Sequence, residues 1–391
     1  VTVAIPGIEH EIYISRNFQT FMAGPYVYAG GRYAVVRVGD SSPLYRVAVI
    51  YSADGLNWKE LDKGNSRSGH ALWVHRSGDV LYILYADATT LVTAICPFDL
   101  TAGTWTTGSE VTGGPTLPAD LSGSWAVAQF ARRSNGDYFA VYQVVVSSKH
   151  KIRYKKYDGS WGSAVDIDAQ GDASGVNSKP AAVLVDEDDN LYFVTTSENA
   201  ILATRTLTAA DTLNATVFHG TWSYLASFGV SIGVCLSDSL NDLLLIPHVT
   251  ANNMSSTYEY ANIGSIPINT VPVMSTFRAS VDQPLDITSD DSECAVVPVA
   301  GALVLLWPVA RAITAGGLAK LVSAKHANGS FEAIQTIHRS GNDIVEICGG
   351  RIDGSTVGIF FTSKWPQDAR LFYTEVGVTG SSTGGDSIVI Y

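Results

Sequence analysis

The sequence predicts an all-β protein built from seven repeated units, each of about fifty residues and four antiparallel strands. Two recurring landmarks, together with the lack of any segment predicted as helix, support this prediction. The first landmark is a turn rich in Gly, Asp or Asn that leads into a strand of β-branched and aromatic residues, as in "SGDVLYILY". Its seven anchors stand 47 to 59 residues apart, at Gly31, Gly78, Gly136, Asp189, Asp242, Gly301 and Gly354.

The second landmark is a small-residue turn followed by an aromatic residue, as in "DGLNW" and "AGTW". Six copies occur, and each aromatic residue stands 25 to 35 residues after a hairpin anchor. Because the two landmarks keep this relation through most of the chain, coincidence does not explain them. A seventh copy is expected near residue 385, where the sequence reads "GGDSIVIY" instead. The six aromatic residues are Trp58, Trp105, Trp161, Trp222, Phe277 and Phe331.

Units of this length with four short strands are typical of a β-propeller, in which each blade packs both faces on its neighbours. We therefore predict a single seven-bladed β-propeller domain over residues 1–391. The last blade is expected to be completed by a terminal segment, either "EIYIS" at 11–15 within the N-terminal segment 1–20 or "SIVIY" at 387–391. A two-domain β-sandwich is the alternative, and it predicts no constant period. The blades are expected near 21–62, 69–111, 124–167, 178–226, 229–280, 292–337 and 343–391.

Composition and charge restrict the classes of partner. With 46% hydrophobic and 16% charged residues, the chain has the composition of a well-packed globular protein. Its formal net charge of −12 argues against nucleic acid or an anionic membrane surface as the main partner, since phosphate binding needs a basic surface. The apolar run 294–310 contains Pro298, Gly301 and Pro308, so two strands and a turn are expected there rather than a membrane-inserted helix.

The sequence predicts no cofactor and no metal site. The four cysteines are dispersed without C-x-x-C spacing, so buried free thiols are expected rather than a zinc site or a disulfide framework. The first residues lack the basic start and apolar core of a signal peptide, although such a segment can be removed before residue 1. The cysteines are Cys96, Cys235, Cys294 and Cys348.

The stretch "SADGLNW" at 52–58 resembles the Asp-box of sialidase-like propellers, whose pattern is Ser-x-Asp-x-Gly-x-x-Trp, except that Gly55 follows Asp54 directly. The resemblance implies that Ser52, Asp54, Gly55 and Trp58 are structural. They would close the turn between the third and fourth strands of a blade, on the face opposite the ligand site. The aromatic ring is expected to pack under the next blade.

In such a propeller the ligand face consists of the loops between the second and third strands and the links between blades. The segment "KWPQDAR" at 364–370 is the richest of these loops, because an exposed Trp can stack on a sugar while flanking cations bind carboxylates or hydroxyls. A solvated loop with an incidental aromatic residue is the alternative interpretation. The predicted ligand-binding residues are Arg16, His70, His150, Arg311, Trp365 and Arg370.

The catalytic residues stay undetermined from the sequence. His70 and His75 are five residues apart, which on a regular strand places them on opposite faces and excludes a shared metal. Sialidases use a Tyr nucleophile supported by Glu. Tyr373 and Glu375 alternate along one predicted strand face with Leu371, which differs from a loop-borne nucleophile.

These observations favour a non-catalytic, carbohydrate-recognising or assembly propeller that acts as an attachment protein. The expected partners are a glycan or glycosylated surface and other protein subunits, and the expected location is extracellular, on a cell surface or a virion. The alternative function is a glycan-active enzyme, either a sialidase-like glycoside hydrolase or a polysaccharide lyase, with its site at the channel mouth. A purely structural decoration protein is a third class, and it predicts no glycan binding.

Overall fold

The computed structural model describes residues 3–4, 22–39, 45–117, 128–146, 149–167, 178–186, 188–197, 201–221, 235–237, 243–251, 259–267, 275–280, 295–299, 302–309, 318–327, 330–332, 335–340, 344–364 and 369–378. Within these ranges the chain forms β-strands and one short 3-10 turn at Lys63–Asn65. The structure is therefore all-β, as the sequence predicts.

The first two groups of four strands form one eight-stranded sheet. The β2–β5 group contains β2 (Met22–Tyr28), β3 (Gly31–Gly39), β4 (Tyr45–Ser52) and β5 (Lys59–Leu61). The β6–β9 group contains β6 (Arg67–Ser77), β7 (Val80–Asp87), β8 (Thr93–Asp99) and β9 (Thr104–Trp105). A short β4–β6 ladder joins the two groups by pairing Arg46 with Ser68 and Val47 with Arg67.

Three separate four-stranded sheets follow in chain order. The first contains β10 (Ala128–Arg132), β11 (Tyr138–Val146), β12 (Lys149–Tyr157) and β13 (Val165–Asp166). The second contains β14 (Ser178–Val185), β15 (Leu191–Ser197), β16 (Ile201–Leu207) and β17 (Val217–Thr221). The third contains β18 (Cys235–Ser237), β19 (Leu243–Ala251), β20 (Glu259–Pro267) and β21 (Ser275–Ser280).

Two sheets complete the strand order, and the final one includes a strand from the N-terminal segment. A five-stranded sheet contains β22 (Ala295–Val299), β23 (Ala302–Val309), β24 (Ala319–Ala327), β25 (Ser330–Phe331) and β26 (Gln335–Ser340). The final sheet contains β27 (Ile344–Arg351), β28 (Thr356–Lys364), β29 (Ala369–Gly377) and, at its outer edge, β1 (Val3–Ala4). The N-terminal segment thus contributes a strand to the last sheet, whereas the two stretches predicted for this role, 11–15 and 387–391, lie outside the described residues.

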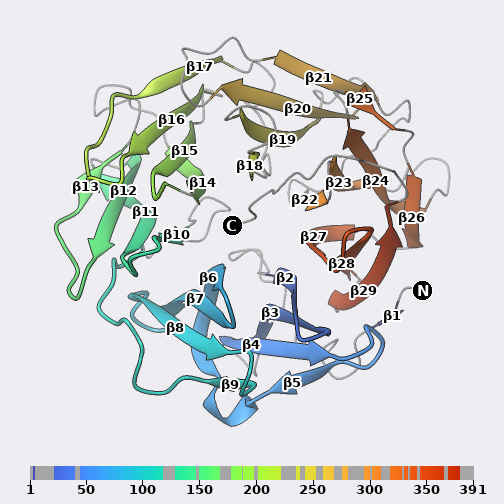
Figure 1. Ribbon diagram of the computed structural model, residues 1–391, viewed down its shortest axis with the longest axis horizontal. Helices are drawn as coiled ribbons and strands as arrows, with labels where there is room; N and C mark the ends of the chain where they lie inside the picture. Colours follow the sequence, from blue (N-terminus) through green and yellow to red (C-terminus); the bar gives the residue numbers. More distant parts are fainter. Residues whose placement is uncertain are drawn as a thin grey trace.

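Figure 1 shows the sheets arranged around a common centre, and the strands nearest to it are β2, β6, β10, β14, β18, β22 and β27. Neighbouring strands within each sheet are antiparallel, so the connections fall alternately on two opposite faces. We call "turn face" the face that carries hairpins such as 28–31 and turns such as 53–58. We call "linker face" the face that carries the second-to-third-strand loops and the links between sheets.

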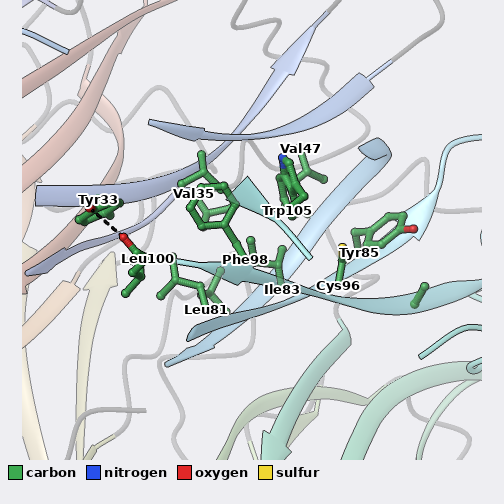
Figure 2. Close-up of a cluster of buried hydrophobic side chains, with 14 residues drawn as sticks. Tyr33, Val35, Val47, Leu81, Ile83, Tyr85, Cys96, Phe98, Leu100 and Trp105 are labelled. Carbon is green, nitrogen blue, oxygen red and sulfur yellow. Dashed lines mark hydrogen bonds between the residues drawn. The ribbon is translucent and has the colours of Figure 1, made fainter. Parts of the chain in front are cut away.

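Alternation along each strand builds the core between sheets. In β3, Tyr33 and Val35 face the β6–β9 group, whereas Ala34 and Val36 face the final sheet. Figure 2 shows the first of these layers, in which Phe98 and Trp105 lie against side chains of both groups. The Tyr33 hydroxyl donates a hydrogen bond to the Leu100 carbonyl at 3.2 Å, which satisfies a polar group at the edge of this apolar layer.

The turn at 52–58 lies between β4 and β5, the third and fourth strands of their group, as the sequence predicts. The Ser52 hydroxyl accepts the Gly55 N–H at 2.9 Å and donates to Asp54 Oδ1 at 3.0 Å. Asp54 Oδ1 also accepts the backbone N–H groups of Leu56 and Asn57, both at 2.8 Å. These hydrogen bonds hold the pKa of the Asp54 carboxyl well below its usual range. The turn is a closed hydrogen-bonded unit.

The direction of Trp58 corrects the expectation that its ring packs under the next blade. The ring lies edge-on against Phe360 and Tyr373, with centroid distances of 4.9 and 4.8 Å. Both partners belong to the final sheet, on the side of β2–β5 away from β6–β9. The reason is strand alternation, because Trp58 shares a face with Ala48 and Ile50, and that face is turned toward β28 and β29.

Candidate functional site

Few of the predicted ligand-binding residues have described side chains. Arg16, Arg311 and Trp365 lie outside the described residues. His150 and Arg370 lie at the linker-face ends of β12 and β29, paired with Val145 and Ser363, and only their backbones are described. His70 is described fully, in β6. The predicted clustering of the six residues therefore stays a prediction.

His70 is buried near the linker-face end of β6, with 3% of its surface exposed. The preceding residue, Gly69, has φ of +154°, and a Cβ added there would lie 2.3 Å from the Ala86 carbonyl oxygen. Only glycine permits this close approach of β6 to β7. Burial and, second, the nearby Arg37 charge lower the pKa of His70 to about 4, against the opposing effect of Asp87. His70 is therefore neutral at pH 7.

Asp87 ends β7 and organises the loop that leads to β8. Its Oδ1 accepts the backbone N–H groups of Thr89 at 3.0 Å and Thr90 at 2.8 Å, and the Thr90 hydroxyl at 2.9 Å. These hydrogen bonds lower the pKa of Asp87 from its ordinary value. The carboxylate is thus committed to holding the loop in shape and is a poor proton donor at neutral pH.

The predicted placement of His70 and His75 on opposite strand faces is wrong. A β-bulge between Ala71 and Trp73 adds one residue to β6 and reverses the alternation beyond it. His70 pairs with Ala86 and His75 with Tyr82, two residues that share one face of β7. The two histidines are still four register positions apart, about 13 Å along the strand. The conclusion that they share no metal therefore stands for a different reason.

The linker face also buries cations that the sequence reasoning missed. Arg37 in β3 is 3% exposed and Lys151 in β12 is 5% exposed, and each lies two residues from the linker-face end of its strand. A sequence signal for Arg37 exists: it occupies the same alternating positions as Tyr33 and Val35, which face the core. Charged residues are rarely buried unless they are paired, so a charged residue at a core-facing position near a strand end indicates a buried polar contact.

Two ion pairs flank this buried layer. Arg46 at the start of β4 pairs with Glu60, and Arg67 at the start of β6 pairs with Glu110. The Arg67 guanidinium also lies 5.6 Å from the centre of the Trp105 ring. The charges of these two arginines are therefore balanced locally by carboxylates.

Tyr373 and Glu375 lie together, but on the turn face. The Tyr373 hydroxyl donates to Glu375 Oε1 at 2.8 Å, and Arg32 pairs with the same carboxylate. Tyr373 is 1% exposed, covered by Trp58, and its pKa is raised by burial and then by its hydrogen bond to the carboxylate. A substrate carbon has no path to the phenol oxygen in this arrangement, so the group is structural.

Within the described ranges, no cluster of three or more His, Cys, Asp or Glu side chains is arranged to hold a metal ion. The described part of the chain also contains no helix with the length and hydropathy needed to span a membrane.

No family model and no curated protein match the sequence. Solved structures match it in fold. The leech intramolecular trans-sialidase gives a TM-score of 0.47 at 11% identity, over 96% of this chain and 69% of the enzyme. A Fusarium graminearum α-L-arabinofuranosidase gives 0.47 at 9% identity, over 96% and 97% of the two chains. The BP39L lectin from Burkholderia pseudomallei gives 0.60 at 12% identity, over 95% of this chain and 98% of the lectin, and this likeness identifies the fold as a β-propeller.

Proposed function

We propose that this chain is a seven-bladed β-propeller of the Asp-box type that recognises an acidic glycan at the centre of its linker face without cleaving it. Such a protein would act in attachment or assembly at a cell or virion surface, where glycans are displayed. Arg16, His150, Arg311, Trp365 and Arg370 would surround the ligand, with Trp365 stacked on a sugar ring and the arginines binding its acidic groups.

One observation carries this proposal: cations are buried beneath the linker-face loops of a strongly acidic protein. Arg37 and Lys151 place positive charge there although the whole chain has a net charge of −12. The positive charge of Arg37 is the second cause, behind burial, of the lowered pKa of His70. Positive charge beneath a surface attracts anionic ligands to it.

No described residue supplies a suitable proton donor near His70, and this favours binding over cleavage. Among the described residues, the carboxylate that acts on His70 is Asp87, and its Oδ1 is already saturated by hydrogen bonds. General acid catalysis of glycoside cleavage needs a carboxyl with a raised pKa. Asp87 has a lowered one. The BP39L lectin supports the proposal only through its fold, which hosts many functions.

The architectural part of the proposal rests on the repeated strand order. Supporting it are three four-stranded sheets with consecutive strand order and, in the turn at 52–58, the hydrogen bonds of Ser52 and Asp54 to backbone N–H groups. We assign seven blades by dividing the eight-stranded sheet at its short β4–β6 ladder.

The test is a glycan array at neutral pH, combined with a turnover assay on sialosides and uronate polysaccharides. We expect the wild-type protein to bind acidic glycans and to release no product. Arg37→Met keeps a long side chain but removes the charge, and it should weaken binding roughly tenfold at low salt and less at high salt.

Arg76→Met is the matched control, because Arg76 lies at the turn-face end of β6, where it donates to the Gly78 carbonyl. This variant changes the net charge equally and should bind as the wild type does. Rapid product release would replace the binding function with the enzymatic alternative. Equal affinity of wild type and Arg37→Met would remove the electrostatic basis of the proposal.

A further inference from the structure

Arg132 is held differently from three other arginines of limited exposure. Arg32, Arg67 and Arg133 each pair with a carboxylate. Arg132 instead lies against two aromatic rings, 4.7 Å from the centre of Tyr82 and 5.7 Å from the centre of Tyr138. Within the described residues it makes no ion pair, although its side chain is only partly exposed.

Strand register and sheet packing bring these groups together on the turn face. Arg132 ends β10 and pairs with Tyr138 at the start of β11. Tyr82 comes from β7 of the neighbouring group, and it belongs to the hydrophobic cluster that fills the space between the two sheets. The three residues therefore lie together at the turn-face junction between the β6–β9 group and the β10–β13 sheet.

Further aromatic rings continue the row outward from Arg132. Tyr138 lies 6.1 Å from Tyr157, and Tyr157 lies 5.3 Å from Trp161, with the rings tilted by 51° and 59°. The indole N–H of Trp161 donates to the Thr112 carbonyl at 3.0 Å, which ties this ring to the segment that follows β9. All four aromatic side chains of the row are only partly buried, so parts of their surfaces are available to a ligand.

The guanidinium has donor capacity that the described residues do not use. It carries five N–H groups. The Arg132 Nε is buried without an acceptor among the described residues. The cation–π contacts hold the group in place but accept no conventional hydrogen bond. A site of this kind is complete only when an external acceptor, above all an anion, is bound.

We propose that this junction binds the carboxylate of an acidic saccharide, with Arg132 on the carboxylate and the Tyr138, Tyr157 and Trp161 rings along the sugar chain. The inference goes beyond the proposed function, because it places a second site on the opposite face. A row of amphipathic rings beside one cation fits a ligand that is both ring-shaped and charged. An inorganic anion would bind Arg132 but would make no use of the row of aromatic rings.

The experiment is a calorimetric titration of the full chain with an oligogalacturonate and with its methyl ester, which removes the charge but keeps the sugar. We expect the acid to bind at least tenfold more tightly than the ester. Arg132→Gln should weaken binding of the acid roughly tenfold to a hundredfold and bring it near the ester. Equal affinity of acid and ester in the wild type would overturn the proposal.

Arg351→Gln is the matched control, since Arg351 is an exposed turn-face arginine of the final sheet, where it donates to the Asp353 carbonyl. It should bind as the wild type does, and an equal loss in both variants would reduce the effect to net charge. If Arg132→Gln does not fold, Arg132→Lys preserves the ring contacts but lacks the planar fork, and undiminished binding by it contradicts the assignment.

Two further measurements test whether the acid preference belongs to this junction and to a saccharide. Arg37→Met leaves the junction unchanged, so acid preference that survives in Arg37→Met and disappears in Arg132→Gln assigns that preference to the junction. A short peptide with a free C-terminal carboxylate, used as competitor, should displace the oligogalacturonate poorly. Equally good displacement by this peptide or by inorganic phosphate would refute the saccharide assignment.

Discussion

The turns at 52–58 and 99–105 occupy equivalent places in neighbouring strand groups, yet they are held together differently. In both, an Asp carboxylate accepts two backbone N–H groups, at 2.8 and 2.8 Å for Asp54 and at 2.7 and 3.0 Å for Asp99. Both end in a buried Trp. The first turn contains Ser52, whereas Pro97 stands two residues before Asp99 in the second and provides no hydroxyl.

The two indole rings show the consequence. Trp58 donates its Nε1–H to the Gly55 carbonyl at 3.2 Å, inside its own turn. Trp105 Nε1 is buried with no acceptor among the described residues, and the backbone N–H of this residue donates instead to Asp62 at 2.9 Å. The first turn is self-contained, whereas the second depends on the link from the preceding strand group. The two turns therefore share the position of a buried aromatic ring, whereas the hydrogen bonds around that ring differ.

Removing either ring should have the largest effect. Trp58→Ala and Trp105→Ala should each lower the free energy of unfolding by about 3 to 5 kcal/mol, because each deletes a buried aromatic side chain between two sheets. Denaturant unfolding measures this loss. A loss below about 1 kcal/mol in Trp58→Ala would show that its contacts with Phe360 and Tyr373 do not hold the first and last sheets together.

The sequence predicts the strand positions and these turns because both depend on local patterns that recur. It does not predict the direction of Trp58, because the period locates a ring along the chain but not on one of two sheet faces. It also fails at His70 and His75, because a single bulge reverses alternation and leaves no mark in the pattern "GHALWVH".

The candidate sites are harder to predict because they depend on contacts between strands that are distant in sequence. Arg132, Tyr82 and Tyr157 belong to three strands of two sheets, and only register and packing bring them together. Arg37 was recognisable as a charged residue in an apolar strand. The proposed role of Trp365 rests on its position in a loop. Residues 365–368 lie outside the described ranges, so this role stays a prediction.

The glycines of the two turns should differ in their tolerance of alanine. Both have positive φ, +77° at Gly55 and +68° at Gly103, so each alanine would have to adopt a left-handed backbone conformation that disfavours a Cβ. At Gly55 a Cβ would also lie 3.0 Å from Glu375 Oε1 and 3.1 Å from a Tyr373 ring carbon, whereas at Gly103 the nearest atom is a Leu61 methyl at 3.7 Å.

We therefore expect Gly55→Ala to cost about 2 to 4 kcal/mol and Gly103→Ala about 1 kcal/mol. Thermal and denaturant unfolding of both variants measure the difference. Equal losses would mean that the first turn does not approach the final sheet as closely as the structure has it.

Replacing each indole with a phenyl ring should give a smaller difference. Trp58→Phe loses a hydrogen bond inside the turn, whereas Trp105→Phe removes a buried N–H that has no acceptor among the described residues. Trp58→Phe should therefore be the more destabilising by about 1 kcal/mol. Denaturant midpoints at constant slope test this order, and the reverse order would contradict the view that the first turn is self-contained.

The smallest expected effect concerns the stability of the fold at low pH. The folded-state pKa of Asp54 lies below its ordinary value of 3.8, so its charged form stabilises the fold above about pH 4, and this contribution is lost as the pH falls toward the folded-state pKa. Buried His70 and His75 each have a pKa lowered from 6.5 to about 4, so they affect stability at higher pH. Their contribution to stability is complete above pH 6.5 and is lost as the pH falls toward 4.

Stability curves of wild type and Asp54→Asn should thus run parallel from pH 7 to about 4, where the histidines titrate equally in both proteins. Below about pH 4 they should converge, because only the wild type still gains a proton on Asp54. Curves that stay parallel down to about pH 2 would show that the hydrogen bonds of the turn do not depend on the charge of this carboxylate.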